Sequence, residues 1–454
     1  MNTQVSVADL PIERRRLLEQ AAIMVSKTSL EDLSIERLAA EADMAVSAVR
    51  NQFADNQALL AGLKRFLISR FNAYIQAELD KLGPDVTASQ RLNAAGLGYF
   101  EFAQAESKNY GAFLKIPMQY APPTNFHAEF PDDVDEPTLN LFLRLTRDVI
   151  IEGGGSEDTD GLAIEALGAF STVHGISHLA TIGILRHLSP AAKKQTVRGV
   201  FSTIWSGINV ALARGVRSFY PDGFRGDAIY NPVPNAKELA RGNAEQKVEA
   251  IFRGAIDAYV HGGLEAITVE NGAEYAGMTH SEAAALIDGD SRLLQQLETY
   301  LDNHDQAMIG SQCFVLPEEH QHALNFMKAT GFGYVGFAVN DPYGFDALIA
   351  MASGSIVPSS FEVNSDDFDM GVAFSFLLDL ARNAIQEAGG QESSWNLYTV
   401  AIAVWAAGHG LAVLLSVGSL RQLPIEEKIA LMNPVLNVVV EGLIVQLGIT
   451  DVKN

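Results

Sequence analysis

Apolar residues recur every three or four positions along most of the chain, which is the spacing of amphipathic α-helices. Residues 10–27 carry one such stripe, formed by Leu17, Ala21, Met24 and Val25. Shorter helical runs follow at 34–41 and 45–53, and longer ones after them. Because no alternating β-branched stretch is long enough for a sheet, we predict an all-α fold.

The two short runs are joined by only four residues, Glu41 to Met44, and such a pair predicts a helix-turn-helix. Ser34 precedes the first run, with Arg37 rather than a glutamate three residues later, so we expect an N-cap without a capping box. Asp55 is placed to cap the next helix, and Val49 and Phe53 are expected to face the core.

The pattern occurs twice. Residues 14–60 match 248–294 without a gap at an offset of 234, and further matches follow at an offset of 235. Gly98-Tyr99 then corresponds to Gly333-Tyr334, and His174-Gly175 to His409-Gly410. A single period of this length is too long for a solenoid and predicts the duplication of one domain-sized unit.

Proline- and glycine-rich breaks divide the chain at matching places, and 216–236 reads as the linker between the units. We predict helix-turn-helix domains at 1–65 and 235–299, each followed by a helical ligand-binding and dimerisation domain, at 66–220 and 300–454.

Composition limits the functions that this chain can have. The net charge of −23 disfavours bulk attraction to nucleic acid or anionic lipid. Cys313 is the only cysteine, which excludes an internal disulfide and suits a reducing compartment, so we expect a cytoplasmic protein. No secretory signal pattern begins the sequence, and the apolar windows 399–418 and 431–449 read as buried helices rather than membrane spans.

Three segments carry a resemblance to the TetR family of transcriptional regulators: Arg14 to Ala22, Leu33 to Ala39, and Phe53 with Leu59-Leu60. Gly333 to Ala338, followed by Trp405 to Gly410, resembles the Trp-His-Gly type of ligand domain in that family. The first unit has Phe170 where the tryptophan would stand.

This resemblance implies paired DNA-binding domains, an effector pocket in each bundle and dimerisation through the last two long helices. In a tandem chain, helices near 166–185 and 196–214 would pack against 401–420 and 428–447, which makes a monomeric pseudo-dimer. Alternatively, two chains pair unit for unit as a homodimer.

The first unit retains polar side chains suited to DNA, because arginine and asparagine or glutamine match guanine and adenine edges. The candidate contacts with bases or phosphates are Arg14, Arg15, Arg16, Ser47, Arg50, Asn51 and Gln52. Compared with the family, Ala45, Val46 and Asn56 replace residues that usually anchor DNA. In the second unit, Ala284, Ala285 and Leu286 stand at the positions of Arg50, Asn51 and Gln52, so we expect Thr279 to cap a helix that does not read DNA.

Aromatic residues at helical spacing indicate either ordinary core or the walls of an apolar effector pocket. The candidate ligand-binding residues of the first unit are Tyr99, Phe102, Phe113, Met118, Tyr120 and His174. Those of the second unit are Tyr334, Phe337, Phe345, Met351, Trp405 and His409. We expect His409 to hydrogen-bond a backbone carbonyl at the helix interface, and His174 and His178 to be core histidines rather than metal ligands.

The sequence contains no phosphate-binding loop, nucleophile elbow or paired zinc-ligand spacing, so we expect no catalytic residue, metal or cofactor. Our leading hypothesis is a ligand-responsive regulator, a repressor whose first unit binds double-stranded DNA and whose effector is an apolar small molecule. The alternative is a small-molecule-binding or protein-interaction module on a TetR-like scaffold without DNA binding. A third possibility is an enzyme that evolved in the ligand pocket.

Overall fold

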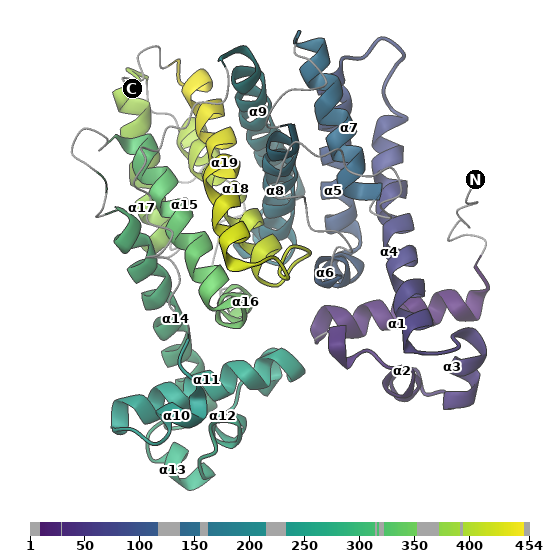
Figure 1. Ribbon diagram of the computed structural model, residues 1–454, viewed down its shortest axis with the longest axis vertical. Helices are drawn as coiled ribbons and strands as arrows, with labels where there is room; N and C mark the ends of the chain where they lie inside the picture. Colours follow the sequence, from purple (N-terminus) through teal and green to yellow (C-terminus); the bar gives the residue numbers. More distant parts are fainter. Residues whose placement is uncertain are drawn as a thin grey trace.

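The computed structural model describes residues 10–28, 30–116, 137–154, 162–214, 233–313, 316, 322–351, 372–390 and 394–448. Every regular element in these ranges is a helix, as the apolar spacing predicts. Two small helical domains, α1 to α3 and α10 to α13, lie at one end of the molecule, and a broad layer of longer helices fills the other end (Figure 1). The predicted loops around 120–133 and 354–369, and most of the predicted linker, lie outside the described residues.

The first small domain contains the predicted helix-turn-helix, and its bounds differ from the sequence prediction by at most two residues. Its helices are α1 (Ile12–Lys27), α2 (Ile35–Glu41) and α3 (Val46–Gln52). The Ser34 hydroxyl accepts a hydrogen bond from the Arg37 amide at 3.2 Å, which confirms the N-cap. Val49 and Phe53 are fully buried in the core of this domain, also as predicted.

A longer helix connects the small domain to the first bundle. Asp55 caps it by accepting a hydrogen bond from the Ala58 amide at 2.7 Å. The helices of this half are α4 (Asn56–Leu79), α5 (Ala88–Ala105), α6 (Ser107–Lys115), α7 (Pro137–Glu152), α8 (Leu162–Thr181) and α9 (Pro190–Arg214). At Gly98 an added Cβ would lie 2.5 Å from the Ile75 backbone, so only glycine allows α4 and α5 to pack this closely.

The second half repeats this order. Its helices are α10 (Ala236–Leu239), α11 (Ala244–Gly262), α12 (Val269–Ala276), α13 (His280–Ala284), α14 (Asp290–Cys313), α15 (Ala323–Asn340), α16 (Pro342–Met351), α17 (Val372–Glu387), α18 (Ser394–Ser416) and α19 (Ile425–Gln446). Contacts also recur at the sequence offset. The Asn56 side chain accepts from the Ile35 amide at 2.9 Å, and the Asp290 side chain accepts from the Val269 amide at 2.7 Å.

The two halves meet through four long helices at the centre of the layer, where α8 packs on α18 and α9 on α19 (Figure 1). Gly175 lies against the backbone of Ala406 and Gly410, while Gly410 lies against that of Ser171 and Gly175. Gly207 and Gly442 form the matching pair between α9 and α19. Each contact is therefore reciprocated 235 residues away, as at a two-fold interface.

The most apolar helices belong to this central layer. The segments Leu397–Ser416 and Ile425–Gln446 are long and apolar enough to cross a membrane, yet 89% and 67% of their most apolar windows are buried inside the protein. Burial of this extent is what core helices require, and it agrees with the interpretation of these windows from the sequence.

Candidate nucleic-acid interface and ligand-binding interior

The turn between α2 and α3 has the same backbone geometry in both halves. Asp43 adopts the left-handed conformation (φ 52°), and Gly277 does so at the matching position (φ 72°). The Met44 amide then donates to the Ala39 carbonyl at 2.9 Å, as Met278 does to Ala273 at 2.8 Å. The turn directs one face of α3 outward and leaves Ser47, Arg50 and Asn51 exposed.

Arg14 takes part in the local fold. Its guanidinium lies 4.6 Å from the centre of the Phe53 ring and donates to the Gln52 carbonyl at 2.7 Å. The Gln52 side chain in turn donates to the Glu13 carboxylate at 3.1 Å. These contacts hold the start of α1 against the end of α3. Arg15 is half-buried and Arg16 is exposed on the same helix.

Arg50 is paired within the domain in the absence of DNA. It donates to the Glu36 carboxylate at 2.9 Å, and this hydrogen bond lowers the pKa of Glu36. Both side chains are more than half exposed, so the pair is a weak surface interaction. Contact with a base would require Arg50 to leave Glu36, or to use the guanidinium nitrogens that Glu36 does not bind.

The matching helix of the second half presents different chemistry. Helix α13 has five residues, and Thr279 caps it as predicted, with Glu282 completing a capping box that α3 lacks. Ala284 and Ala285 are exposed where the first half exposes Arg50 and Asn51. Small apolar side chains and a carboxylate neither bind phosphate nor donate to base edges.

The candidate ligand residues of the first half form a tight aromatic cluster around Phe71. The Phe71 ring stacks on Phe113 at 5.1 Å and meets Tyr99 and Phe102 edge to face at 5.1 and 5.6 Å. Tyr99 and Phe102 are fully buried, and Phe113 is half-buried. Met118 and Tyr120 lie outside the described residues.

The second interior differs at its centre, because Asp305 stands at the position of Phe71. Asp305 is buried, its Oδ1 has no hydrogen-bond partner, and burial raises the pKa of its carboxyl to about 8. Asp305 is not among the site residues predicted from the sequence, although the offset of 234 that relates the two halves pairs it with Phe71. A buried carboxyl of this kind marks a candidate functional site.

The other predicted ligand residues of this half surround the same interior. Tyr334 and Phe345 meet edge to face at 5.5 Å, and Phe337 and Phe345 at 6.2 Å. Trp405 is half-buried and packs on Phe374 at 4.9 Å. Met351, at the end of α16, is also half-buried.

Each half has a buried tyrosine–histidine hydrogen bond, and a histidine–histidine hydrogen bond crosses between the halves. Tyr99 bonds His174 Nδ1 at 2.6 Å, and Tyr334 bonds His409 Nδ1 at 2.8 Å. His409 Nε2 then bonds His178 Nδ1 at 2.9 Å. The prediction of a backbone carbonyl as the partner of His409 is therefore wrong, because a hydroxyl and a second imidazole occupy both ring nitrogens.

These histidines are neutral in the folded protein. Burial lowers the pKa of His174 to about 3 and that of His178 to about 4, and it lowers the pKa of His409 well below the usual value. Within the ranges that the structure describes, no group of three or more histidine, cysteine or acidic side chains is arranged to hold a metal ion.

Acidic residues at matching positions, Glu106 and Asp341, form different ion pairs in the two halves. In the first half, Arg70 of α4 pairs with Glu106. In the second half, Arg253 of α11 pairs with Asp341, at the position of Glu106, and also bonds the Tyr300 hydroxyl at 2.7 Å. The second pair is buried and joins the helix-turn-helix domain directly to the bundle, whereas the first joins two parts of the bundle.

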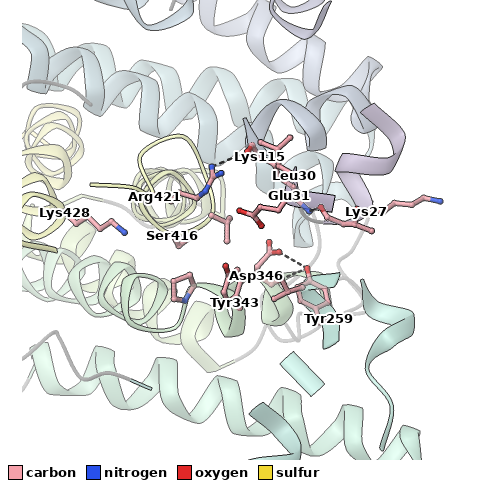
Figure 2. Close-up of a pocket in the computed structure, with 14 residues that line it drawn as sticks. Lys27, Leu30, Glu31, Lys115, Tyr259, Tyr343, Asp346, Ser416, Arg421 and Lys428 are labelled. Carbon is pink, nitrogen blue, oxygen red and sulfur yellow. Dashed lines mark hydrogen bonds between the residues drawn. The ribbon is translucent and has the colours of Figure 1, made fainter. Parts of the chain in front are cut away.

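A cavity of about 280 Å³ lies where the small domains meet the bundles. Its walls include the ends of α1, α6 and α18, helix α16 and the start of α19 (Figure 2). None of the twelve ligand residues proposed from the sequence lines this cavity.

Two curated bacterial proteins are similar to part of this chain. The HTH-type transcriptional regulator BetI of Klebsiella pneumoniae (strain 342) is 30% identical over 104 residues, which cover 23% of this chain and 53% of that protein. The HTH-type transcriptional regulator BetI of Serratia proteamaculans (strain 568) is 28% identical over 97 residues, or 21% and 48%. No protein-family model matches. The chain thus spans about half the length of these relatives, and the similarity indicates a TetR-like region within an all-helical protein.

Proposed function

We propose that this protein is a cytoplasmic, ligand-responsive transcriptional regulator of the TetR type, in which two fused units form a pseudo-dimer. The first unit contacts double-stranded DNA through α3, and the second unit supplies the partner surface and a sensing interior. The exposed polar face of α3, next to a turn of helix-turn-helix geometry, is the observation that carries this proposal.

The asymmetry between α3 and α13 supports DNA contact through the first unit. Residues 1–65 contain eight Lys/Arg and nine Asp/Glu, whereas residues 235–299 contain five and eleven. Because phosphate contacts supply most non-specific affinity, the first domain is the better of the two for DNA. Three candidate contacts are exposed and have no partner in the described fold: Arg16, Ser47 and Asn51.

The reciprocal glycine contacts support the fused pseudo-dimer. Through these contacts α8 packs on α18 and α9 packs on α19 of the same chain. The surfaces that a second chain would need for the same packing are therefore already in use. A monomeric chain then carries both helix-turn-helix domains at one end of the molecule (Figure 1).

We propose that an apolar effector enters one of the two bundle interiors and shifts the population between DNA-binding and released states, so that the protein acts as a repressor. The second interior is the better candidate, because it contains the half-buried Trp405 and the Asp305 carboxyl, whose Oδ1 has no hydrogen-bond partner. The residues proposed to act are binding residues, and no catalytic role or cofactor is proposed.

A DNA-free binding module is the second candidate function, and two observations favour it. The net charge is −23, and Arg14 and Arg50, two of the predicted DNA contacts, are already engaged by groups of their own domain. In this alternative the scaffold binds a small molecule or a protein and α3 is a solvated surface helix.

Binding of the full chain to labelled duplex from its own upstream region tests the proposal, at low and at moderate salt. Arg50→Ala/Asn51→Ala is expected to abolish saturable binding, whereas the matched variant His280→Ala/Glu282→Ala in α13 is expected to retain it. Equal binding by both variants would refute DNA contact through α3. Absence of specific binding at low salt would favour the DNA-free module.

A further inference from the structure

The cavity between the small domains and the bundles has walls from both halves of the chain. The first half contributes Thr28 and Glu31 after α1, and Lys115 at the end of α6. The second half contributes residues of α11 and α16, and the ends of α18 and α19. A molecule bound here would touch both helix-turn-helix domains at once.

Cationic groups gather on one side of this cavity, although the protein is strongly acidic. Arg421 donates to the Lys115 carbonyl at 3.3 Å and the Gly418 carbonyl at 3.2 Å, and Lys115 donates to the Thr28 carbonyl at 3.0 Å. Lys428 also lines this cavity. Carbonyl oxygens satisfy the N–H groups but do not neutralise the charge.

Lys428 and Ser416 have no hydrogen-bond partner within the described residues. Lys428 is 8% exposed and Ser416 5% exposed, and the hydroxyl of Ser416 is unsatisfied. Burial lowers the pKa of Lys428, as expected of an amine with no compensating charge. A buried hydroxyl without a partner, such as that of Ser416, is costly unless water or a ligand completes its hydrogen bonds.

In the first half, the side chains at the matching positions form hydrogen bonds within the protein. Lys193 and Thr181 occupy the positions of Lys428 and Ser416, and both bond the side chain of Gln104, at 2.8 Å for Lys193. In the second half the position of Gln104 is occupied by the buried Val339, which has no polar atom in its side chain. The replacement of glutamine by valine therefore removes the side chain that satisfies the lysine and the hydroxyl in the first half, and in the second half the corresponding Lys428 and Ser416 line the cavity.

On the opposite side the cavity offers acceptors. The Asp346 carboxylate lies there and accepts a hydrogen bond from the Tyr259 hydroxyl at 2.9 Å, whereas the Glu31 carboxylate lies nearer to Arg421 and Ser416 (Figure 2). We propose that this cavity binds a small organic carboxylate that also carries a hydroxyl or amino group. Its carboxylate takes the position of the missing glutamine between Lys428 and Ser416, near Arg421, and its donor group meets Asp346.

The position of this site gives it a regulatory consequence, which rests on the function proposed above. The cavity wall at the end of α1 belongs to the first helix-turn-helix domain, and the wall at Tyr259 belongs to α11 of the second. The domains already meet nearby, where His261 lies 3.9 Å from Asp32. A bound carboxylate would fix their separation, and therefore the spacing of the surfaces presented to DNA.

The test is ligand binding by the full chain without DNA, measured by thermal shift and calorimetry. The probes are 4-hydroxybenzoate, 3-hydroxybutyrate and phenylalanine at millimolar concentration, each beside its primary amide. At least one acid is expected to stabilise the protein saturably, and its amide to bind about ten- to hundredfold more weakly, because hydrogen bonds to charged groups are the stronger ones.

Two variants remove the site in different ways. Val339→Gln supplies the internal partner found in the other half, and Lys428→Met removes the unpaired amine; both are expected to lose binding and to unfold no more easily than the parent protein. Gln104→Val, the reverse exchange in the first half, is expected to leave binding at this cavity unchanged. Measurement of the unfolding midpoint shows that each variant is folded.

Three results would overturn the proposal: no saturable stabilisation by any of the acids, equal binding of acid and amide, or undiminished binding in Val339→Gln and Lys428→Met. Loss of stability in Lys428→Met would also count against it, because that result assigns the amine a structural role. Since none of these measurements includes DNA, failure of DNA binding leaves their outcome intact and would affect only the regulatory consequence.

Discussion

The crossing of α8 and α18 allows a sharp test of whether one chain supplies both halves of the four-helix interface. An added Cβ at Gly410 would lie 2.8 Å from the Gly175 amide nitrogen, and the Ser171 carbonyl oxygen is closer still. Gly408, two residues earlier in the same helix, has space, because its added Cβ would lie 3.7 Å from the Gly331 Cα and make ordinary contacts. Gly410→Ala and Gly408→Ala therefore add the same methyl group to one helix with opposite steric results.

The expected magnitudes follow from this geometry. Alanine gains about 1 kcal/mol over glycine in a helix interior, so Gly408→Ala should stabilise the protein by up to about that amount. Overpacking costs typically about 1–3 kcal/mol, and the upper end applies at Gly410 because the obstructing atoms are backbone. Gly410→Ala should therefore lower the free energy of unfolding by about 2 kcal/mol. The free energies of unfolding of the two variants should then differ by about 3 kcal/mol.

Urea unfolding followed by far-ultraviolet circular dichroism and tryptophan fluorescence measures both free energies. Sedimentation of each variant gives the mass and shows whether the chain remains a monomer. Equal stability of the two alanine variants would refute the close approach of α8 and α18, and with it the interface inside one chain. A parent protein with twice the mass of the chain would instead support pairing between chains.

Three further predictions concern buried charges. Burial raises the pKa of Asp305 above its value in the unfolded chain, so the free energy of unfolding of the parent protein should fall as pH rises from about 4 to 8. The urea midpoint of Asp305→Asn should not show this fall with pH. Arg253→Met leaves Asp341 buried and unpaired and should destabilise the second half by about 3–5 kcal/mol in urea, whereas Arg253→Met/Asp341→Asn should recover most of the loss. The pKa of His178 is lowered to about 4 in the folded protein, so its contribution to the free energy of unfolding is present above pH 6.5 and is lost as pH falls towards 4. If the parent protein and His178→Leu unfold over the same range of acid pH, this reasoning is wrong.

Much of the local structure could be predicted from the sequence, because it depends on residues close together in the chain. Ser34 and Asp55 cap helices where their positions indicate, and Val49 and Phe53 face the core. These features follow from helical periodicity and from the free amides of a first turn, which need no tertiary information.

The partners of buried polar groups could not be predicted in the same way. His409 bonds Tyr334 and His178, and its contact with His178 joins residues separated by 231 positions. Arg14 is a predicted DNA contact, and in the fold its guanidinium also donates to the Gln52 carbonyl and lies over the Phe53 ring at the end of α3. Spacing along the chain indicates which face a side chain occupies, and only the packing of helices determines which groups meet there.

The differences between the halves fall at positions where a symmetric dimer would be constrained. In a homodimer each substitution occurs twice, so a change that opens a site on one side opens it on both. In the proposed fused chain, Gln104 can satisfy one lysine while Val339 leaves the other free, and Phe71 can fill one interior while Asp305 occupies the other. The first half thus keeps a filled aromatic core in its bundle, and the second half carries a buried carboxyl at the matching place. Exchanging these residues between halves, as Val339→Gln and Asp305→Phe, should make the halves more alike and the protein more stable, at the expense of ligand binding.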